Sequence, residues 1–164
     1  MALKTLTLFA LLALTVLSPA MARTPRLDQF PSAPTARQYR DYYGTAFTTQ
    51  PKLLSTPERT YRYGVTNMTP QDMAHWGGTF QLPKGARRFT AWIYADSGLR
   101  APLEFTFRAE DRNGTVLDSV VVHPGETVTV DLQTQGARAL FFVTDLRIGH
   151  GTASRIIVGE PRFE

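Results

Sequence analysis

The sequence predicts an all-β fold, namely an antiparallel jelly-roll β-sandwich preceded by a Pro-rich N-terminal arm. Between residues 78 and 163, short segments rich in Val, Ile, Phe and Thr alternate apolar with polar side chains. Turn-forming sequences separate these segments, among them Pro83-Lys84-Gly85, Asn113-Gly114 and Pro124-Gly125. Short strands of period two with frequent turns are typical of β-sandwiches. The fold class does not by itself assign a function.

The first 22 residues differ from the rest and are predicted to be a signal peptide. Lys4 precedes an apolar stretch over residues 6–17, and the segment ends in Ala20-Met21-Ala22. A basic start, a short apolar region and an A-x-A end are typical of an exported chain. An uncleaved anchor helix is the alternative, but the apolar stretch is short for a bilayer. We therefore expect a secreted or periplasmic protein that starts at Arg23, with no stable membrane insertion after cleavage.

The composition limits the classes of function. The chain has no cysteine, which excludes a disulfide scaffold, a thiol nucleophile and a thiolate metal site. Loss of Lys4 with the signal peptide would leave 17 of the 18 basic side chains against 14 acidic ones. Most of the basic residues are arginines spread along the chain, not gathered on one segment with aromatic residues. We therefore expect no nucleic-acid partner.

Residues 23–58 are predicted to form an arm or linker in front of the sandwich. Prolines recur there beside Ser, Thr, Gln and Arg, a composition that favours extended chain over helix. The exception is a segment in which Tyr39, Tyr42 and Tyr43 stand between charged residues. These rings either dock on the sandwich or form an exposed patch, and we favour docking because Tyr is well suited to half-buried positions.

Residues 59–164 are predicted to form the sandwich itself. The alternation over residues 59–64 puts Tyr61 and Tyr63 on one face and makes this segment a candidate first strand. Residues 65–76 are predicted to be a loop because a proline and polar residues interrupt the apolar pattern. Further strands are predicted over residues 78–82, 87–95, 103–110, 115–123, 126–132, 138–145 and 155–159.

Two features predict how these strands pair and pack. Asn113-Gly114 predicts a hairpin between residues 103–110 and residues 115–123. Residues 138–145 are apolar on both faces, which predicts a central strand covered on both sides. Together with the alternation of the other strands, this predicts a core of Phe80, Leu82, Phe89, Ile93, Phe105, Phe107, Val120, Val130, Leu140, Phe142 and Ile156.

The strand sequences also resemble those of a known family. Residues 78–96 read GTFQLPKGARRFTAWIYAD, and later segments read FTFR at 105–108, GTVLDS at 114–119, LFFVTD at 140–145 and IVGEP at 157–161. In these motifs, which span about half of the chain, the sequence resembles the NPCBM-type domain, a carbohydrate-binding module with a galactose-binding-like jelly-roll fold. It departs from the family in two places. The family usually has a Gly-x-His-Ala-like turn before the first matched strand, and His75-Trp76-Gly77 of this chain lies nearby without matching it. Where the family has paired acids after the strand, this chain has Asp96-Ser97. The resemblance implies a jelly roll and a carbohydrate ligand.

The ligand-binding candidates are aromatic and polar residues on strand faces and at strand ends. Aromatic rings cover the flat faces of sugars, whereas Asp, Arg and His bind their hydroxyl groups. Trp92 and Tyr94 project from the strand face opposite Phe89 and Ile93. They therefore either form an exposed platform or pack beneath the N-terminal arm or a long loop. With Trp76 as a second candidate platform, the candidate set is His75, Trp76, Trp92, Tyr94, Asp96 and Arg100.

No catalytic residue, metal ligand or cofactor is predicted. The three histidines are far apart in the sequence and stand in none of the hydrolase motifs that use histidine. Asp96, Asp145 and Glu160 lie at predicted strand ends and could bind a structural calcium ion through oxygen ligands. We favour ordinary turn or surface roles for these three acids.

The sequence leads to two hypotheses about function. The first is an exported, non-catalytic module that binds carbohydrate, such as cell-wall or extracellular polysaccharide. The second is an envelope protein–protein interaction or assembly module that uses the sandwich as a scaffold and the tyrosines of residues 39–43 as its contact.

Overall fold

The computed structural model describes residues 33–42, 44–67, 75–145 and 155–164. The signal peptide predicted over residues 1–22 and the phenol ring of Tyr43 lie outside the described residues. Within the described part of the chain, no helix has the length and apolar character needed to cross a membrane.

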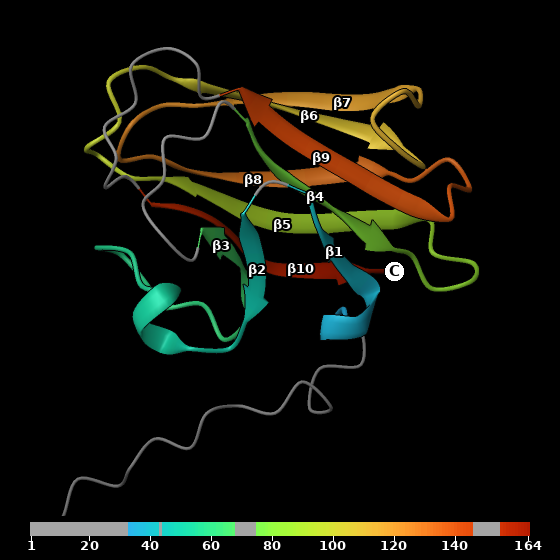
Figure 1. Ribbon diagram of the computed structural model, residues 1–164, viewed down its shortest axis with the longest axis horizontal. Coiled ribbons are helices and arrows are strands. Elements are labelled where there is room, and N and C mark those ends of the chain that lie inside the picture. Colours follow the sequence, from blue (N-terminus) through green and yellow to red (C-terminus); the bar gives the residue numbers. More distant parts are fainter. Residues whose placement is uncertain (1–32, 43, 68–74, 146–154) are drawn as a thin grey trace, which may run out of the picture.

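The chain folds into two five-stranded antiparallel sheets packed face to face, the jelly-roll β-sandwich that the sequence predicts (Figure 1). In spatial order the first sheet contains β1 (Tyr39–Asp41), β4 (His75–Gln81), β9 (Ala139–Asp145), β6 (Leu103–Ala109) and β7 (Val116–Val122). The second sheet contains β2 (Thr45–Thr48), β3 (Gly64–Asn67), β10 (Ile156–Phe163), β5 (Arg88–Ala95) and β8 (Thr127–Gln133). Two short 3₁₀ helices, η2 (Ala36–Gln38) and η3 (Pro51–Leu53), precede β1 and follow β2.

The strands predicted from residue 78 onward are confirmed, and most bounds agree to within a residue or two. The hairpin predicted at Asn113-Gly114 joins β6 to β7. The predicted central strand is β9, which pairs with β4 on one side and β6 on the other. β10 continues past the predicted end at Gly159, because an irregularity in its pairing with β5 accommodates Glu160 and Pro161.

The segment before β4 differs from the prediction. The first strand of this region begins at Gly64, not at residue 59, and β4 already begins at His75. The predicted loop over residues 65–76 was therefore too long at both ends. Glycines obscured the pattern: Gly64 lies so close to β10 that a Cβ atom there would be 2.5 Å from the carbonyl oxygen of Val158. Close backbone approach of this kind favours glycine inside a strand.

The arm predicted over residues 23–58 contributes one edge strand to each sheet. β1 pairs with β4, and β2 pairs with β3. Tyr39 docks on the sandwich as expected, with its ring centroid 5.2 Å from that of Phe80. The chain passes from one sheet to the other between Asp41 and Thr45, and the Asp41 carboxylate accepts hydrogen bonds from the Thr45 backbone N–H at 2.9 Å and hydroxyl at 3.0 Å.

The core lies between the two sheets and is rich in aromatic rings. The predicted core residues are buried there, except that Leu82 and Val120 are partly buried against its edge. A second, smaller apolar cluster lies on the outer face of the second sheet and contains Leu54, Tyr61, Tyr94 and Ile157. This cluster exists because residues 51–61 return across that face.

Candidate functional site

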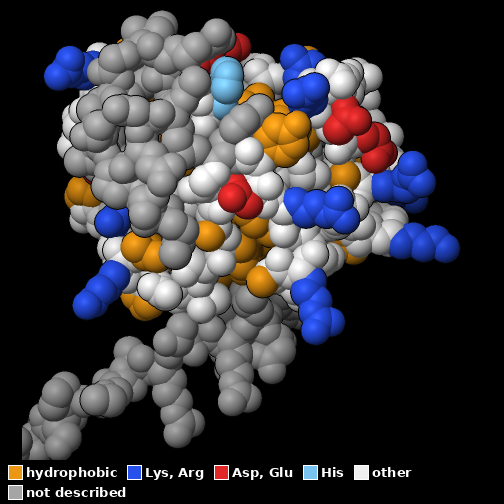
Figure 2. Space-filling view, in the orientation of Figure 1, with side chains coloured by type: hydrophobic (Ala, Val, Ile, Leu, Met, Phe, Trp, Pro, Cys, Tyr) orange, Lys and Arg blue, Asp and Glu red, His pale blue; other side chains and the backbone are white. Residues whose placement is uncertain are grey.

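A groove of about 590 Å³ lies on the outer face of the first sheet. Hydrophobic, acidic and basic side chains lie next to one another on the face of the molecule seen in Figure 2. The lining of the groove comes from β4, β6, β9 and the loops that flank β6. It consists of His75, Pro102, Glu104, Thr106, Arg108, Arg112, Phe141, Val143 and Asp145.

The strand registers explain the shape of the groove. Side chains on the outer face form rows across the strands, and the middle row contains only small or medium residues: Gly77, Val143, Thr106 and Ser119. Gly77 leaves this row open because it has no side chain, and an added Cβ would collide with the carbonyl oxygen of Phe142. The next row, toward the β6–β7 turn, contains larger side chains: Arg40, Thr79, Phe141 and Arg108. The groove therefore spans β4, β9 and β6 in width, and along the strand direction it runs from the row of His75 and Asp145 at one end to the row of Phe141 and Arg108 at the other.

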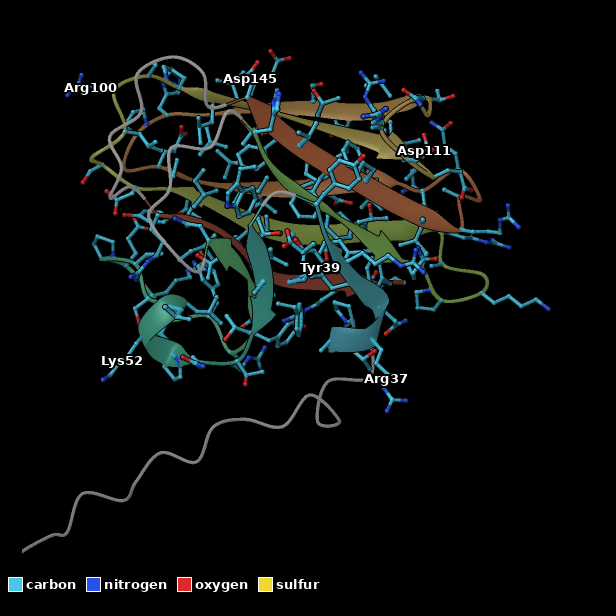
Figure 3. The ribbon with its side chains drawn as sticks, in the orientation of Figure 1. Arg37, Tyr39, Lys52, Arg100, Asp111 and Asp145 are labelled. Atoms are coloured by element: carbon cyan, nitrogen blue, oxygen red, sulfur yellow. The ribbon has the colours of Figure 1, made fainter. Side chains whose placement is uncertain are left out.

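The two ends of the groove have opposite charge. One end contains Glu104 and Asp145, with the Nδ1 atom of His75 at 4.0 Å from a carboxylate oxygen of Asp145. The other end contains Arg108 and Arg112. Glu104 and Arg108 are four residues apart on one strand, so their Cα atoms are separated by roughly 13 Å. Figure 3 shows Asp145 and Asp111, which precedes Arg112, at opposite ends of the first sheet.

An exposed aromatic ring stands beside the groove. Phe141 in its lining is buried, and the ring of Tyr42 stands edge-on to it with the centroids 5.6 Å apart. Tyr42 keeps 46% of its surface exposed. Its position follows from the fold of β1, because the Tyr39 ring lies against Gly78 and its hydroxyl is hydrogen-bonded to Thr45 (Figure 3). Burial raises the pKa of the Tyr39 phenol, so this anchoring hydroxyl keeps its proton.

Of the predicted site residues, only His75 lies in the groove. The prediction that Trp76 forms a platform is wrong. Its ring is 1% exposed and lies between the sheets, edge-on to Phe105 with centroids 5.9 Å apart. Because neighbouring residues of a strand point to opposite faces, an outward His75 turns Trp76 into the core.

Trp92 and Tyr94 lie on the outer face of the second sheet, on the opposite side of the molecule from the groove. The alternative in which they pack beneath another segment is the one observed. Tyr94 is buried, and Trp92 stacks on Tyr61 with the ring centroids 6.3 Å apart. Guanidinium carbons of Arg59 and Arg162 lie 5.3 Å and 5.8 Å from the Trp92 ring centroid. Trp92 is thus enclosed by protein side chains and is not an open platform.

The other predicted polar residues have separate roles. Asp96 caps the turn after β5 by accepting a hydrogen bond from the Gly98 N–H at 2.7 Å. Arg100 is exposed in the same loop (Figure 3). The Glu160 carboxylate is buried and lies 2.8 Å from Arg62 and 3.0 Å from Arg162. Burial alone would raise the pKa of Glu160, but hydrogen bonds and charge from Arg62 and Arg162 hold it below its usual value.

The acids considered for calcium are therefore not brought together. Asp96 accepts a hydrogen bond within a turn, Glu160 forms ion pairs with arginines, and Asp145 lines the groove. Over the ranges that the structure describes, no three His, Cys, Asp or Glu side chains are grouped so that they could hold a metal ion.

The sequence analysis missed Tyr42, Glu104, Arg108 and Arg112 as site residues. One signal was present: alternation places Glu104, Thr106 and Arg108 on the polar face of a strand. This signal is shared with every solvated strand face. Only the pairing of β6 with β9, and of β9 with β4, shows that these side chains border a groove.

Comparison with known proteins identifies the fold and no more. No protein-family model matches the chain, and no curated protein matches it. The K2 cleaved adhesin domain of Lys-gingipain matches with a TM-score of 0.54 at 10% identity, over 86% of this chain and 98% of that chain. The K1 cleaved adhesin domain of Lys-gingipain from Porphyromonas gingivalis W83 matches with a TM-score of 0.52 at 10% identity, over 77% and 88% of the two chains.

A carbohydrate-binding module is among the matches as well. The structure of CBM51-2 in complex with GlcNAc and INT domains, from Clostridium perfringens ZmpB, matches with a TM-score of 0.50 at 11% identity. The match covers 67% of this chain and 24% of that one, so this chain spans about a quarter of its length. The chain therefore has a β-sandwich fold that carbohydrate-binding modules also have, whereas its likeness to the NPCBM-type domain in particular stays a prediction.

Proposed function

We propose that this protein is an exported, non-catalytic module that binds carbohydrate in the groove on the outer face of the first sheet. The observation that carries the proposal is the combination of an exposed ring, Tyr42, with hydroxyl-binding groups along one trough. Carbohydrate recognition needs both parts, because sugars have flat apolar faces and a rim of hydroxyl groups. Export to the periplasm or the medium is supported by the N-terminal sequence, and cell-wall or extracellular polysaccharide is the expected ligand.

A non-catalytic role is favoured by the setting of the two carboxylates in the groove. Glu104 and Asp145 are both exposed on an open sheet face. Glycosidases depend on a carboxylic acid held in an apolar pocket beside an ionised carboxylate. Among the described residues neither acid lies in such a pocket, so we expect binding without turnover.

The test is glycan binding by the wild type and by Tyr42→Ala. We expect binding in a screen of cell-wall and extracellular polysaccharides, followed by calorimetry on the oligosaccharides that bind. Tyr42→Ala should weaken binding by about 1–3 kcal/mol, the scale of an aromatic contact at a hot spot. The melting temperature should hardly change because the ring is half exposed.

Tyr42→Phe is the matched control, since it keeps the ring and should keep most of the affinity. If Tyr42→Ala and Glu104→Gln both bind the glycan as tightly as the wild type does, the binding site lies outside the groove. Absence of binding to every glycan would contradict the function itself.

A protein contact is the second candidate, and one observation favours it. β7 is an edge strand of the first sheet, and its Val116 and Val121 are 46% and 50% exposed. An exposed apolar edge can accept a strand from another protein. The sequence analysis considered the tyrosines of residues 39–43 as the contact with another protein, but Tyr39 is buried in the core and is not accessible to a partner. If crosslinking in cells recovers an envelope protein through β7, and Val121→Lys abolishes the crosslink while no glycan binds, this candidate replaces the first.

A further inference from the structure

We infer that the groove is specific for an anionic glycan and that Arg108 and Arg112 bind its acid group. The inference rests on the proposed carbohydrate-binding function and adds the class of ligand. A neutral sugar requires a ring platform and hydroxyl-binding groups, which are supplied by Tyr42 beside the groove and by Thr106 and Glu104 in it. The two guanidinium groups go beyond this requirement, and their geometry suits carboxylate or sulfate oxygens.

The charges of Arg108 and Arg112 are not compensated within the described chain. Three arginines elsewhere, Arg62, Arg88 and Arg162, form ion pairs of 3.0 Å or less. Arg108 instead donates a hydrogen bond to the carbonyl oxygen of Gly114 at 3.1 Å, which holds its guanidinium at the groove without neutralising it. Neither groove arginine forms an ion pair with any residue that the structure describes.

The acids next to Arg112 in the sequence have other hydrogen-bond partners. Glu110 accepts a hydrogen bond from the Arg138 N–H at 2.9 Å, and Asp111 accepts one from the Asn113 N–H at 2.8 Å. Asp111 (labelled in Figure 3) thereby shapes the β6–β7 turn. Glu110 ties that turn to the chain entering β9. Backbone N–H groups thus orient both carboxylates, and among the described residues neither carboxylate forms an ion pair with Arg108 or Arg112.

The opposite end of the groove gives the ligand a direction. Glu104 and Asp145 repel an acid group and accept hydrogen bonds from hydroxyls. A chain of sugars that lies in the groove along the strand direction therefore has its acid group at the arginine end, away from Glu104 and Asp145. The buried Phe141 lies beside Arg108 at the arginine end, and the Tyr42 ring stands edge-on to it.

The experiment is calorimetry on residues 23–164 with three tetrasaccharides: galacturonic acid, its full methyl ester and a sulfated galactan. The ester keeps the sugar rings and removes the charge. We expect the wild type to bind at least one acidic tetramer about tenfold or more tightly than the ester, the scale of hydrogen bonds to charged groups. Whichever acidic tetramer binds more tightly identifies the acid group as carboxylate or sulfate. Added salt should weaken binding of the acidic tetramer more than that of the ester.

Arg112→Gln is the decisive variant, because its side chain makes no hydrogen bond with the described residues and the fold should be unaffected. It should remove the preference for the acidic tetramer while affinity for the ester changes less than about twofold. Arg87→Gln is the matched control: it removes the same charge from an exposed position away from the groove and should keep the preference.

The outcomes separate this inference from the proposed function. Equal wild-type affinity for the ester and the acidic tetramers, or an unchanged preference in Arg112→Gln, would overturn the anionic specificity and leave carbohydrate binding intact. No binding of the three tetramers, and none in the wider polysaccharide screen, would overturn both.

Discussion

At the scale of single residues, the aromatic side chains occupy three different environments. Trp76 points between the sheets and is part of the core. Trp92 points outward but is covered by Tyr61 and two arginines. Tyr42, which follows the short edge strand β1, remains exposed beside the groove. The alternation of side chains along a strand determines whether a ring points into the core or out of the sheet. Whether an outward ring stays exposed depends on which other segments pack over it.

We predict that Trp76→Ala costs about 3–5 kcal/mol of unfolding free energy, because a large ring deleted from a core leaves a cavity. Trp92→Ala should cost less, about 1–3 kcal/mol, since it loses partly exposed stacking and cation–π contacts. Urea unfolding followed by circular dichroism measures both. If Trp92→Ala loses as much unfolding free energy as Trp76→Ala, the outer-face cluster is as important for stability as the core.

At the scale of elements, the irregular stretch of β10 is held by one buried carboxylate. Glu160 has a φ of 44°, in the left-handed region, and its backbone N–H donates to the carbonyl oxygen of Tyr63 at 2.9 Å. Its side chain pairs with Arg62 on the segment before β3 and with Arg162 on its own strand. This cluster joins the irregular part of β10 to the chain that enters β3, and it depends on the ionised form of Glu160.

The depressed pKa of Glu160 predicts an acid-dependent loss of stability. The folded state favours the ionised carboxylate, so its contribution is complete above the unfolded pKa of about 4.3 and is lost as pH falls through the lower folded value. Between about pH 5 and pH 3, unfolding free energy should therefore fall more steeply in the wild type than in Glu160→Gln. At neutral pH the variant should be less stable by about 1–3 kcal/mol, the range for hydrogen bonds to charged groups.

Asp131→Asn is the control for this pH dependence. Asp131 also has a lowered pKa, owing to its hydrogen bonds with Arg88, but that pair is exposed. Exposed ion pairs contribute little to stability, so the Asp131 variant should follow the wild-type curve more closely. Equal slopes in the wild type and Glu160→Gln would contradict the role given to the buried cluster.

At the scale of the whole molecule, the segment before residue 59 completes the sandwich. β1 and β2 form one edge of each sheet, and Leu54 is fully buried on the outer face of the second sheet. Tyr39 and Phe47 pack on rings of the core and of the β3 region, including Phe80 and Tyr63. The groove also depends on this segment because Tyr42 belongs to it.

We predict that a chain that begins at residue 59 is much less stable than one that begins at residue 33. Each large apolar side chain lost from a buried position removes roughly 1.5–3 kcal/mol, and domains have only about 5–15 kcal/mol in total. Thermal unfolding of the two chains under identical conditions gives the comparison. Equal melting temperatures would show that residues 33–58 are a dispensable arm.

The sequence by itself determined the strand segments, the β6–β7 hairpin and nearly all of the core. These follow from alternation and turn chemistry, which are properties of neighbouring residues. Alternation also placed Glu104, Thr106 and Arg108 on one strand face. Sequence reasoning stopped where glycines replaced side chains, as at Gly64 and Gly77, because the contact that requires a glycine lies on another strand.

Only the tertiary structure decided where the site is. The groove needs His75, Asp145 and Glu104 in one row, from strands joined by long connections. The covering of Trp92 needs residues 51–61 to cross the outer face of strands that come much later in the chain, namely β5 and β10. Register between distant strands is set by the packing of both sheets together, so no local pattern records it.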